Sequence, residues 1–187
     1  MALQNRNPDM RPIAVNLLAS FATAFLATAA MAESVITPFV GDYSGSAEVE
    51  AYDGSMVNRD MSVAIRETKE GFSIDWSSTT YRSEKATQKS YHIEFKPSDR
   101  DGVFAAAMTK NVFGHEIQLD PMKGLPYVWA RIVDDTLTVF SLYVTAEGGY
   151  EIQQFDRSLA KGGLDLEFSR LNSEDAKMAV STHLKRQ

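Results

Sequence analysis

The sequence predicts an all-β protein, an antiparallel up-and-down β-barrel of eight to ten strands with a short C-terminal helix. Runs of β-branched and aromatic residues recur from residue 41 onward, separated by short turns rich in Gly and Asp. No stretch alternates strands with helices in the βαβ manner of a parallel sheet. Open edges of so many strands would aggregate, so they close into a barrel or stack as two sheets. The order of sequential hairpins favours the barrel.

Residues 1–32 have the pattern of an export signal. Two arginines precede an apolar run over 13–30, and Ala-Met-Ala at 30–32 matches the small-residue cleavage pattern. The alternative is an uncleaved membrane anchor, because the run is nearly long enough to span a bilayer. The alanine content and the cleavage pattern favour removal. We therefore predict a single β-barrel domain over 33–187, with no stable membrane insertion after signal cleavage.

The composition bounds the compartment and the partners. The 187 residues include no Cys, which excludes disulfides and a lipid-modified cysteine, and the formal net charge is −6. Together with the signal, this predicts a soluble protein of a Gram-negative periplasm. An acidic chain without a basic cluster argues against nucleic acid and anionic membranes as partners.

The first half of the domain alternates in hydrophobicity with period two. It predicts strands over about 41–52, 57–68, 72–76, 91–95 and 103–109. The polar stretch 82–88 predicts a loop. The longer stretch 110–126 holds two Gly and two Pro and is either a ligand-binding mouth or a crossover that only closes the barrel.

The second half, 127–171, reads as a meander of four strands separated by Asp-Asp and Gly-rich turns. In 150–159 the apolar residues shift from even to odd positions, which predicts a β-bulge near Gln153. The strand ending at Arg170 is expected to be the last one, paired back to the first, with Arg170 near Tyr43.

The C-terminal residues predict a short helix. Asn172 or Ser173 is a suitable N-cap, acidic residues follow it, and basic residues come at the end, as the helix dipole favours. Ala176, Val180 and Leu184 would form its apolar stripe.

No motif for chemistry is found. The three histidines, His92, His115 and His183, are too far apart in sequence for a local metal site, and there is no nucleophile elbow. We predict no catalytic residue, no metal and no cofactor. A hydrolase or isomerase centred on His115, which precedes Glu116, is the catalytic alternative.

Aromatic residues occur on nearly every predicted strand. Barrels of this size either fill their interior with such side chains or leave room for one small ligand. We predict a non-catalytic barrel that binds a small apolar or amphipathic ligand. The expected cavity residues are Trp76, Phe104, Met108, Trp129 and Tyr143, with 110–126 as the mouth.

The stretch 137–144 is apolar on both faces, which is unusual for a barrel strand. The outer face then needs cover, from the terminal helix or from another protein. The second functional hypothesis is therefore a periplasmic interaction or assembly module, with a homo-oligomer formed through 136–145.

The Gly-Asp-Tyr opening at 41–43, the meander and a basic residue ending the last strand resemble the lipocalin or calycin family over about 41–184. In that family a Gly-x-Trp on the first strand packs under a basic residue from the end of the last strand; Tyr43 stands here in place of the Trp. The resemblance implies a ligand-binding barrel.

The same opening resembles haem-binding nitrobindin-type barrels, whose proximal histidine lies near the C-terminus and would correspond to His183. An uncharacterised family of exported proteobacterial β-barrels is the alternative to both resemblances.

Overall fold

The computed structural model describes residues 34–51, 54–82, 85–107, 109–110, 116–117, 119–172 and 177–187. The chain divides into two units, Met1–Ala32 and Glu33–Gln187. The first unit carries the predicted export signal and lies outside the described residues, so its cleavage stays a prediction.

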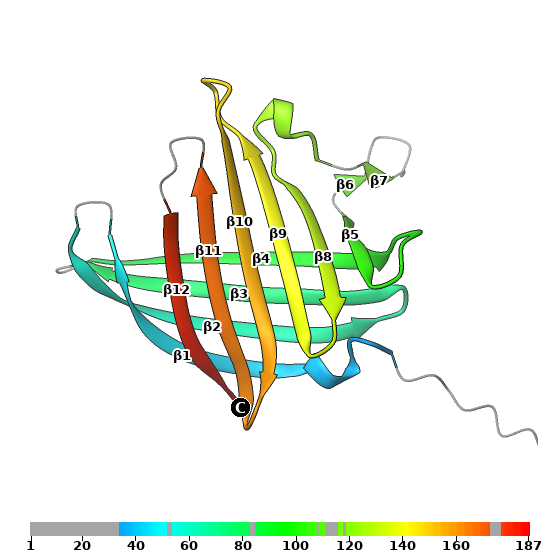
Figure 1. Ribbon diagram of the computed structural model, residues 1–187, viewed down its shortest axis with the longest axis horizontal. Coiled ribbons are helices and arrows are strands. Elements are labelled where there is room, and N and C mark those ends of the chain that lie inside the picture. Colours follow the sequence, from blue (N-terminus) through cyan, green and yellow to red (C-terminus); the bar gives the residue numbers. More distant parts are fainter. Residues whose placement is uncertain are drawn as a thin grey trace, which may run out of the picture. The chain divides into compact units, whose positions relative to one another are not determined.

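Ten strands of the second unit form one closed antiparallel barrel, in which neighbours in the sheet follow one another along the chain. Figure 1 shows β8 to β12 running steeply across the direction of β1 to β4, so the two halves of the barrel cross. The predicted up-and-down barrel is confirmed. Its strands are β1 (Gly41–Glu50), β2 (Met56–Thr68), β3 (Gly71–Arg82), β4 (Lys85–Pro97), β5 (Val103–Ala107), β8 (Tyr127–Val133), β9 (Thr136–Val144), β10 (Tyr150–Ala160), β11 (Gly163–Asn172) and β12 (Lys177–Arg186).

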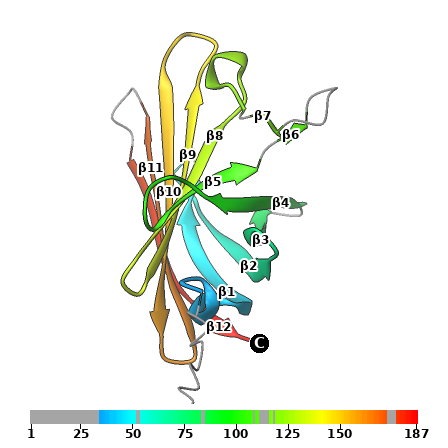
Figure 2. The same cartoon turned by 90° about the vertical axis from the view of Figure 1, so that its right-hand side faces the viewer.

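The longest connection joins β5 to β8. It contains a separate two-stranded sheet of β6 (Thr109–Lys110) and β7 (Glu116–Ile117), followed by the 3-10 helix η2 (Pro121–Lys123). Figures 1 and 2 show the β6–β7 pair beyond the end of β5, off the barrel wall.

The prediction of a C-terminal helix is wrong, because Lys177–Arg186 forms strand β12. Val180 and Leu184 are four residues apart, a spacing that fits one helix face and one strand face equally well. The strand forms because β12 pairs with β11 on one side and with β1 on the other. In the pairing with β11, Val180 lies opposite Phe168. None of the helices in the described part of the chain is long and apolar enough to cross a bilayer.

The predicted bulge in β10 is also wrong. Its pairing with β9 and β11 is uninterrupted, with Gln153 opposite both Ser141 and Arg170. Apolar Ile152 lies on the outer face, whereas the inward set of β10 contains polar Gln153 and Arg157. The shift in hydrophobic phase therefore reflects a polar interior at this point in the barrel.

One end of the barrel is filled by side chains, and we call it the packed end. The 3-10 helix η1 (Thr37–Phe39) precedes β1 here, and Phe72 stacks on Phe95 with ring centroids 5.0 Å apart. Burying these side chains supplies most of the hydrophobic stabilisation. Large residues at most 1% exposed are Ile36, Phe39, Ile65, Phe72, Ile74, Phe95, Leu137, Leu164 and Leu184.

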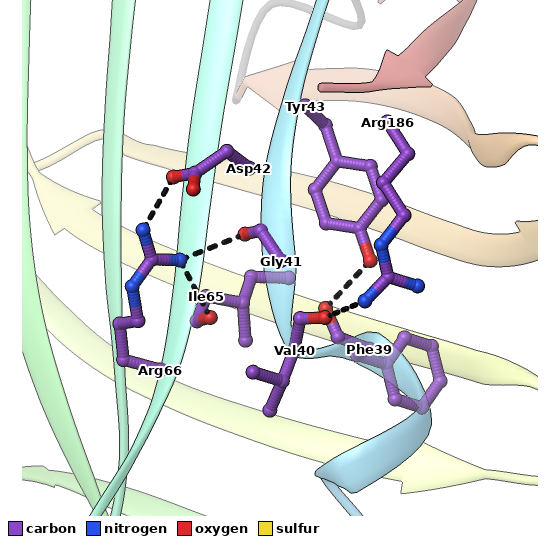
Figure 3. Close-up of polar contacts among 8 residues, drawn as sticks. All are labelled: Phe39, Val40, Gly41, Asp42, Tyr43, Ile65, Arg66 and Arg186. Carbon is purple, nitrogen blue, oxygen red and sulfur yellow. Dashed lines mark hydrogen bonds and ion pairs between the residues drawn. The ribbon is translucent and has the colours of Figure 1, made fainter.

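Tyr43 and Arg186 join the first strand to the last at the packed end (Figure 3). The Arg186 guanidinium carbon lies 5.6 Å from the centroid of the Tyr43 ring, and Arg186 donates a hydrogen bond to the carbonyl of Val40. The Tyr43 hydroxyl donates to the carbonyl of Phe39 over 2.9 Å. Burial raises the pKa of Tyr43, against the opposing charge of Arg186. A Cβ at Gly41 would lie 3.0 Å from that hydroxyl, so the close approach favours glycine.

The prediction that Arg170 lies near Tyr43 is therefore wrong. β11 does not pair with β1, because β12 lies between them. Arg66 on β2 stabilises the start of β1 from the other side. Its Nη2 donates a hydrogen bond to Asp42 Oδ1 over 2.5 Å, and its Nη1 donates one to the Gly41 carbonyl over 3.0 Å.

Candidate ligand-binding cavity

A cavity of about 450 Å³ occupies the half of the barrel away from the packed end. Its lining reaches Glu50 at the end of β1, Arg82 at the end of β3 and Pro126 just before β8. These positions lie at one end of the barrel, because the connections β1–β2, β3–β4 and β5–β8 all turn there. We call it the open end. The volume is within the range of about 300–1,000 Å³ typical of small-molecule sites.

Two aromatic rings meet across the lumen between the cavity and the core. Trp76 on β3 and Phe155 on β10 belong to strands that do not pair, yet their ring centroids are 5.9 Å apart. Tyr91 stacks on Trp76 at 5.3 Å, and Phe168 lies 4.8 Å from Phe155. Both Trp76 and Phe155 also pack against the buried core. The rings therefore lie on the core side of the cavity lining, and we call them the aromatic floor.

The wall above this floor is mixed in polarity. Tyr143 and Gln153 add polar groups, and burial raises the pKa of Tyr143, so its hydroxyl is neutral at physiological pH. A wall of this kind suits a molecule with an apolar body and a polar group. The apolar residues that line the cavity, those of the floor included, are Ala51, Met61, Val63, Trp76, Ile93, Pro126, Val128, Val139, Phe155, Leu166, Phe168, Val180 and Leu184.

The charges on the cavity wall are opposite in sign to the net charge of the chain. Among the described residues, five basic side chains and one acidic side chain, Glu50, line it, although the chain as a whole carries −6. The basic residues come from five strands, so only closure of the barrel brings them together. They are Arg59, Arg82, Lys89, Arg157 and Arg170.

Three of these arginines form a cationic group near the open end. Burial lowers the pKa of Arg59, and the neighbouring charges of Arg82 and Arg170 lower it further. Arg59 Nε donates to Thr80 Oγ1 over 2.9 Å, and Arg170 Nε lies 4.0 Å from Glu151 Oε2. Like charges held this close favour the arrival of an anion.

Arg157 lies deeper, beside the aromatic floor. Its guanidinium carbon is 5.8 Å from the ring centroid of Trp76 and 5.6 Å from that of Phe155. The residue is 2% exposed, and its buried Nε and Nη1 have no hydrogen-bond partner among the described residues. Burial lowers the pKa of Arg157 to about 10, so the side chain stays charged at neutral pH.

The carboxylate that acts most directly on Arg157 is on the other side of the sheet. Asp156 favours the charged form of Arg157, but it accepts hydrogen bonds from Thr138 Oγ1 and Gln154 Nε2 at 2.6 Å each. Consecutive residues of a strand point to opposite faces. Asp156 therefore offers no acceptor to the Arg157 donors inside the barrel.

The structure separates the five residues predicted for the cavity. Trp76 and Tyr143 line it. Phe104 is 7% exposed and belongs to the packed end, with its ring edge against Phe72. Trp129 lies on the outer face, stacked on Phe140 at 4.8 Å, because Val128 and Ala130 take the inward positions of β8. Met108 lies outside the described residues. Their roles in ligand binding stay predictions.

The histidines do not converge on the cavity. His183 is on the outer face of β12, with Nδ1 2.7 Å from Asp165 Oδ1, and His92 pairs with Asp75 across two strands in the same way. The haem ligand implied by the nitrobindin resemblance therefore faces away from the interior. His115 lies outside the described residues, so the hydrolase or isomerase hypothesis stays untested.

The predicted loop at 82–88 is wrong, and the error hid two cavity residues. Arg82 pairs with Lys85 at the end of a β3–β4 hairpin, which carries Arg82 and Lys89 on the inward face. The available signal was their period-two spacing with Trp76 and Tyr91. It was missed because a run of polar residues is typical of a loop when the inner face of the barrel is expected to be apolar.

No protein-family model matches the chain, and no curated protein matches its sequence. Within the described ranges, no group of three or more His, Cys, Asp or Glu side chains is placed to hold a metal ion.

Proposed function

We propose that this protein is an exported, calycin-like barrel that binds a small apolar or amphipathic molecule and carries out no chemistry on it. The observation that carries the proposal is the cavity of about 450 Å³, with its apolar wall, inside a barrel whose other end is closed by packed side chains. A barrel that is closed at one end and open at the other suits retention of a single small molecule.

The Tyr43–Arg186 contact supports kinship with the calycins. A basic residue of the last strand lies over the aromatic ring of the first strand, as the lipocalin resemblance implies, with Tyr43 in place of Trp. The 3-10 helix η1 ends just before this contact and supplies the carbonyl that accepts the Tyr43 hydrogen bond.

Residues 1–32 support export to a Gram-negative periplasm. Cell fractionation and the intact mass of the protein recovered from the periplasm test this. We expect a chain that begins at Glu33; recovery of the uncleaved chain in the membrane fraction would contradict it.

A neutral fluorescent probe tests the binding function without assuming a charge on the ligand. Of the two tryptophans, Trp76 lines the cavity and Trp129 lies outside it, so Trp129→Phe leaves one reporter in place. We expect N-phenyl-1-naphthylamine to bind at one site per chain and to quench Trp76. In native mass spectrometry, a molecule retained through mild purification should leave on solvent extraction. Absence of probe binding together with absence of any extracted molecule would end the proposal.

The outer face of β8 and β9 favours the second function, a protein–protein contact. Tyr127, Trp129 and Phe140 form a continuous aromatic row with centroid distances of 5.7 and 4.8 Å, and Arg131 lies 5.8 Å from the Phe140 ring. The three rings are half-buried and Arg131 is exposed, and aromatic residues beside an arginine are typical of interaction surfaces. Light scattering tests this function: a dimer that Phe140→Lys dissociates would support it, and a monomer at every concentration would contradict it.

A further inference from the structure

Arg157 is a buried cationic side chain with two nitrogens, Nε and Nη1, that have no hydrogen-bond partner among the described residues. Burying a charged side chain is unfavourable unless other groups replace the water it loses. The ring faces of Trp76 and Phe155 replace part of that hydration through cation–π contact. They accept no conventional hydrogen bonds, so Nε and Nη1 stay without partners among the described residues.

A purely structural arginine would be expected to face a carboxylate on the same side of the sheet. Among the described residues, the carboxylates near the interior are Glu50 and Glu151, and both belong to the open end, where Glu151 lies near Arg170. Asp156 is engaged on the outer face. Within the described ranges, the buried Nε and Nη1 of Arg157 thus meet no acceptor, and the carboxylate of a ligand could supply one.

We propose that the cavity takes an amphipathic organic anion, with its carboxylate bound by Arg157 and its apolar body along the cavity wall towards the open end. This inference rests on the proposed binding function and specifies its ligand class. Guanidinium–carboxylate hydrogen bonds are among the strongest in proteins. Arg157 is almost fully buried, and the low dielectric of such surroundings strengthens the interaction further.

The apolar lining explains why an inorganic anion alone does not satisfy the site. Val139, Leu166 and Phe168 line the same cavity as Arg157 and offer no hydrogen bonds through their side chains. Burying an alkyl chain against them adds favourable free energy with every methylene removed from water. The group near the open end, Arg59, Arg82 and Arg170, favours entry of the anion.

Three ligands with the same twelve-carbon chain separate the headgroup from the body: dodecanoate, dodecanol and dodecyltrimethylammonium. Binding is measured by calorimetry and by Trp76 fluorescence in the Trp129→Phe protein, below the aggregation concentration of each ligand. We expect dodecanoate to bind about 10- to 100-fold more tightly than dodecanol, as for a hydrogen bond to a charged group. Dodecyltrimethylammonium should bind most weakly.

Arg157→Met tests the residue, and Arg131→Met is its matched control, because it removes the same charge from the outer face. Arg157→Met should reduce the dodecanoate affinity at least about tenfold and leave the dodecanol affinity within about twofold. Arg131→Met should change neither affinity. Circular dichroism of each variant confirms the fold, and Arg157→Lys, which keeps the charge, should recover part of the preference for dodecanoate.

The outcomes distinguish this inference from the proposed function. Equal binding of dodecanoate and dodecanol by the wild-type protein would overturn the inference and leave the binding function intact, whatever the variants do. Failure of all three ligands and of the neutral probe would reject the binding function itself. Acetate and inorganic phosphate are tested as competitors: if either displaces dodecanoate at a concentration similar to that of dodecanoate itself, the site takes a free anion and the amphipathic ligand is rejected.

Discussion

The guanidinium carbon of Arg157 lies 5.8 Å from the Trp76 ring centroid, although the two residues belong to strands that do not pair. The contact crosses the lumen and holds a buried charged group in the lining of the cavity. It has two consequences, because a buried charge without hydrogen-bond acceptors is unfavourable for folding and favourable for binding an anion.

Replacing Arg157 should therefore stabilise the ligand-free protein. Burial lowers its pKa in the folded protein to about 10, well below that of the free side chain. At about 1.4 kcal/mol per unit of pKa, burial of the charge costs on the order of 3 kcal/mol. We expect Arg157→Met to raise the free energy of unfolding by about 1–3 kcal/mol at pH 7 in urea denaturation. Arg131→Met should change it by less than about 0.5 kcal/mol. A destabilised Arg157→Met would show that the arginine has a structural partner.

The affinity for dodecanoate should depend on pH at both ends of the range. Below a pH of roughly 4–5 the ligand carboxylate becomes protonated and neutral. Above a pH of about 10 the unliganded folded protein loses the Arg157 proton, and with it the attraction. We expect a plateau between these limits in calorimetry. Glu151 and Lys89 near the open end also carry charge, so the profile of Arg157→Met is measured as the reference.

The lowered pKa of Arg157 also makes the stability of the ligand-free protein depend on pH. Because the pKa of Arg157 is lower in the folded protein, the unfolded chain binds more protons in the window that begins at about pH 10 and ends at the pKa of the free side chain. The ligand-free protein therefore recovers stability as the pH rises through that window, as far as Arg157 alone is concerned. Below pH 10 the full cost of the buried charge is present.

Arg186 should contribute more to stability than Arg170. Arg186 covers the Tyr43 ring and hydrogen-bonds to the Val40 carbonyl, so Arg186→Ala removes a cation–π contact and a charged hydrogen bond. We expect a loss of about 2 kcal/mol in the free energy of unfolding. Arg170→Ala should lose less, because it also relieves the repulsion between Arg170 and Arg59. The reverse order would restore Arg170 as the residue that closes the barrel.

The cationic group near the open end should act on the rate of binding more than on its strength. Arg82 is exposed at the end of the β3–β4 hairpin. We expect Arg82→Gln to slow dodecanoate association in stopped-flow fluorescence and to weaken its dependence on salt, with little change in the dissociation rate. Dodecanol association should be unchanged. An equal effect on both ligands would indicate a steric change at the opening.

His183 should have no influence on the cavity. It pairs with Asp165 on the outer face of β12, and both side chains are largely exposed. We expect the dodecanoate affinity of His183→Ala, measured by calorimetry, to stay within about twofold of the wild-type value. The absorption spectrum of added haem should be the same with either protein. A haem spectrum that depends on His183 would mean that β12 can present its outer face to a ligand.

The β class and the meander from β8 to β11 follow from local patterns. β-branched and aromatic residues at every second position, with Gly and Asp at the turns, are enough to specify strands and hairpins. The end of the chain shows the limit of such patterns. The spacing of Val180 and Leu184 fits a helix and a strand equally well. The strand forms because β1 and β11 each have an edge with which β12 can pair.

The cavity was predicted in kind but not in its chemistry. Trp76 and Tyr143 are aromatic residues at inward positions of their strands. Trp129 is also an aromatic residue on a strand, but its position faces outward. The basic residues of the wall are isolated in the sequence, among acidic and neutral neighbours. Nothing local distinguishes Arg157, inside the barrel, from Arg131, outside it.

The sequence by itself determined that strands form, where most of them turn and which faces of the meander are apolar, because these depend on contacts between residues near in the chain. The tertiary structure decided which strand closes the barrel, which basic residue covers Tyr43 and which charges meet in the interior. Those outcomes depend on pairings between the two ends of the chain and on contacts across the lumen, such as that of Arg157 with Trp76. Register and closure set them, and neither is encoded in any single stretch.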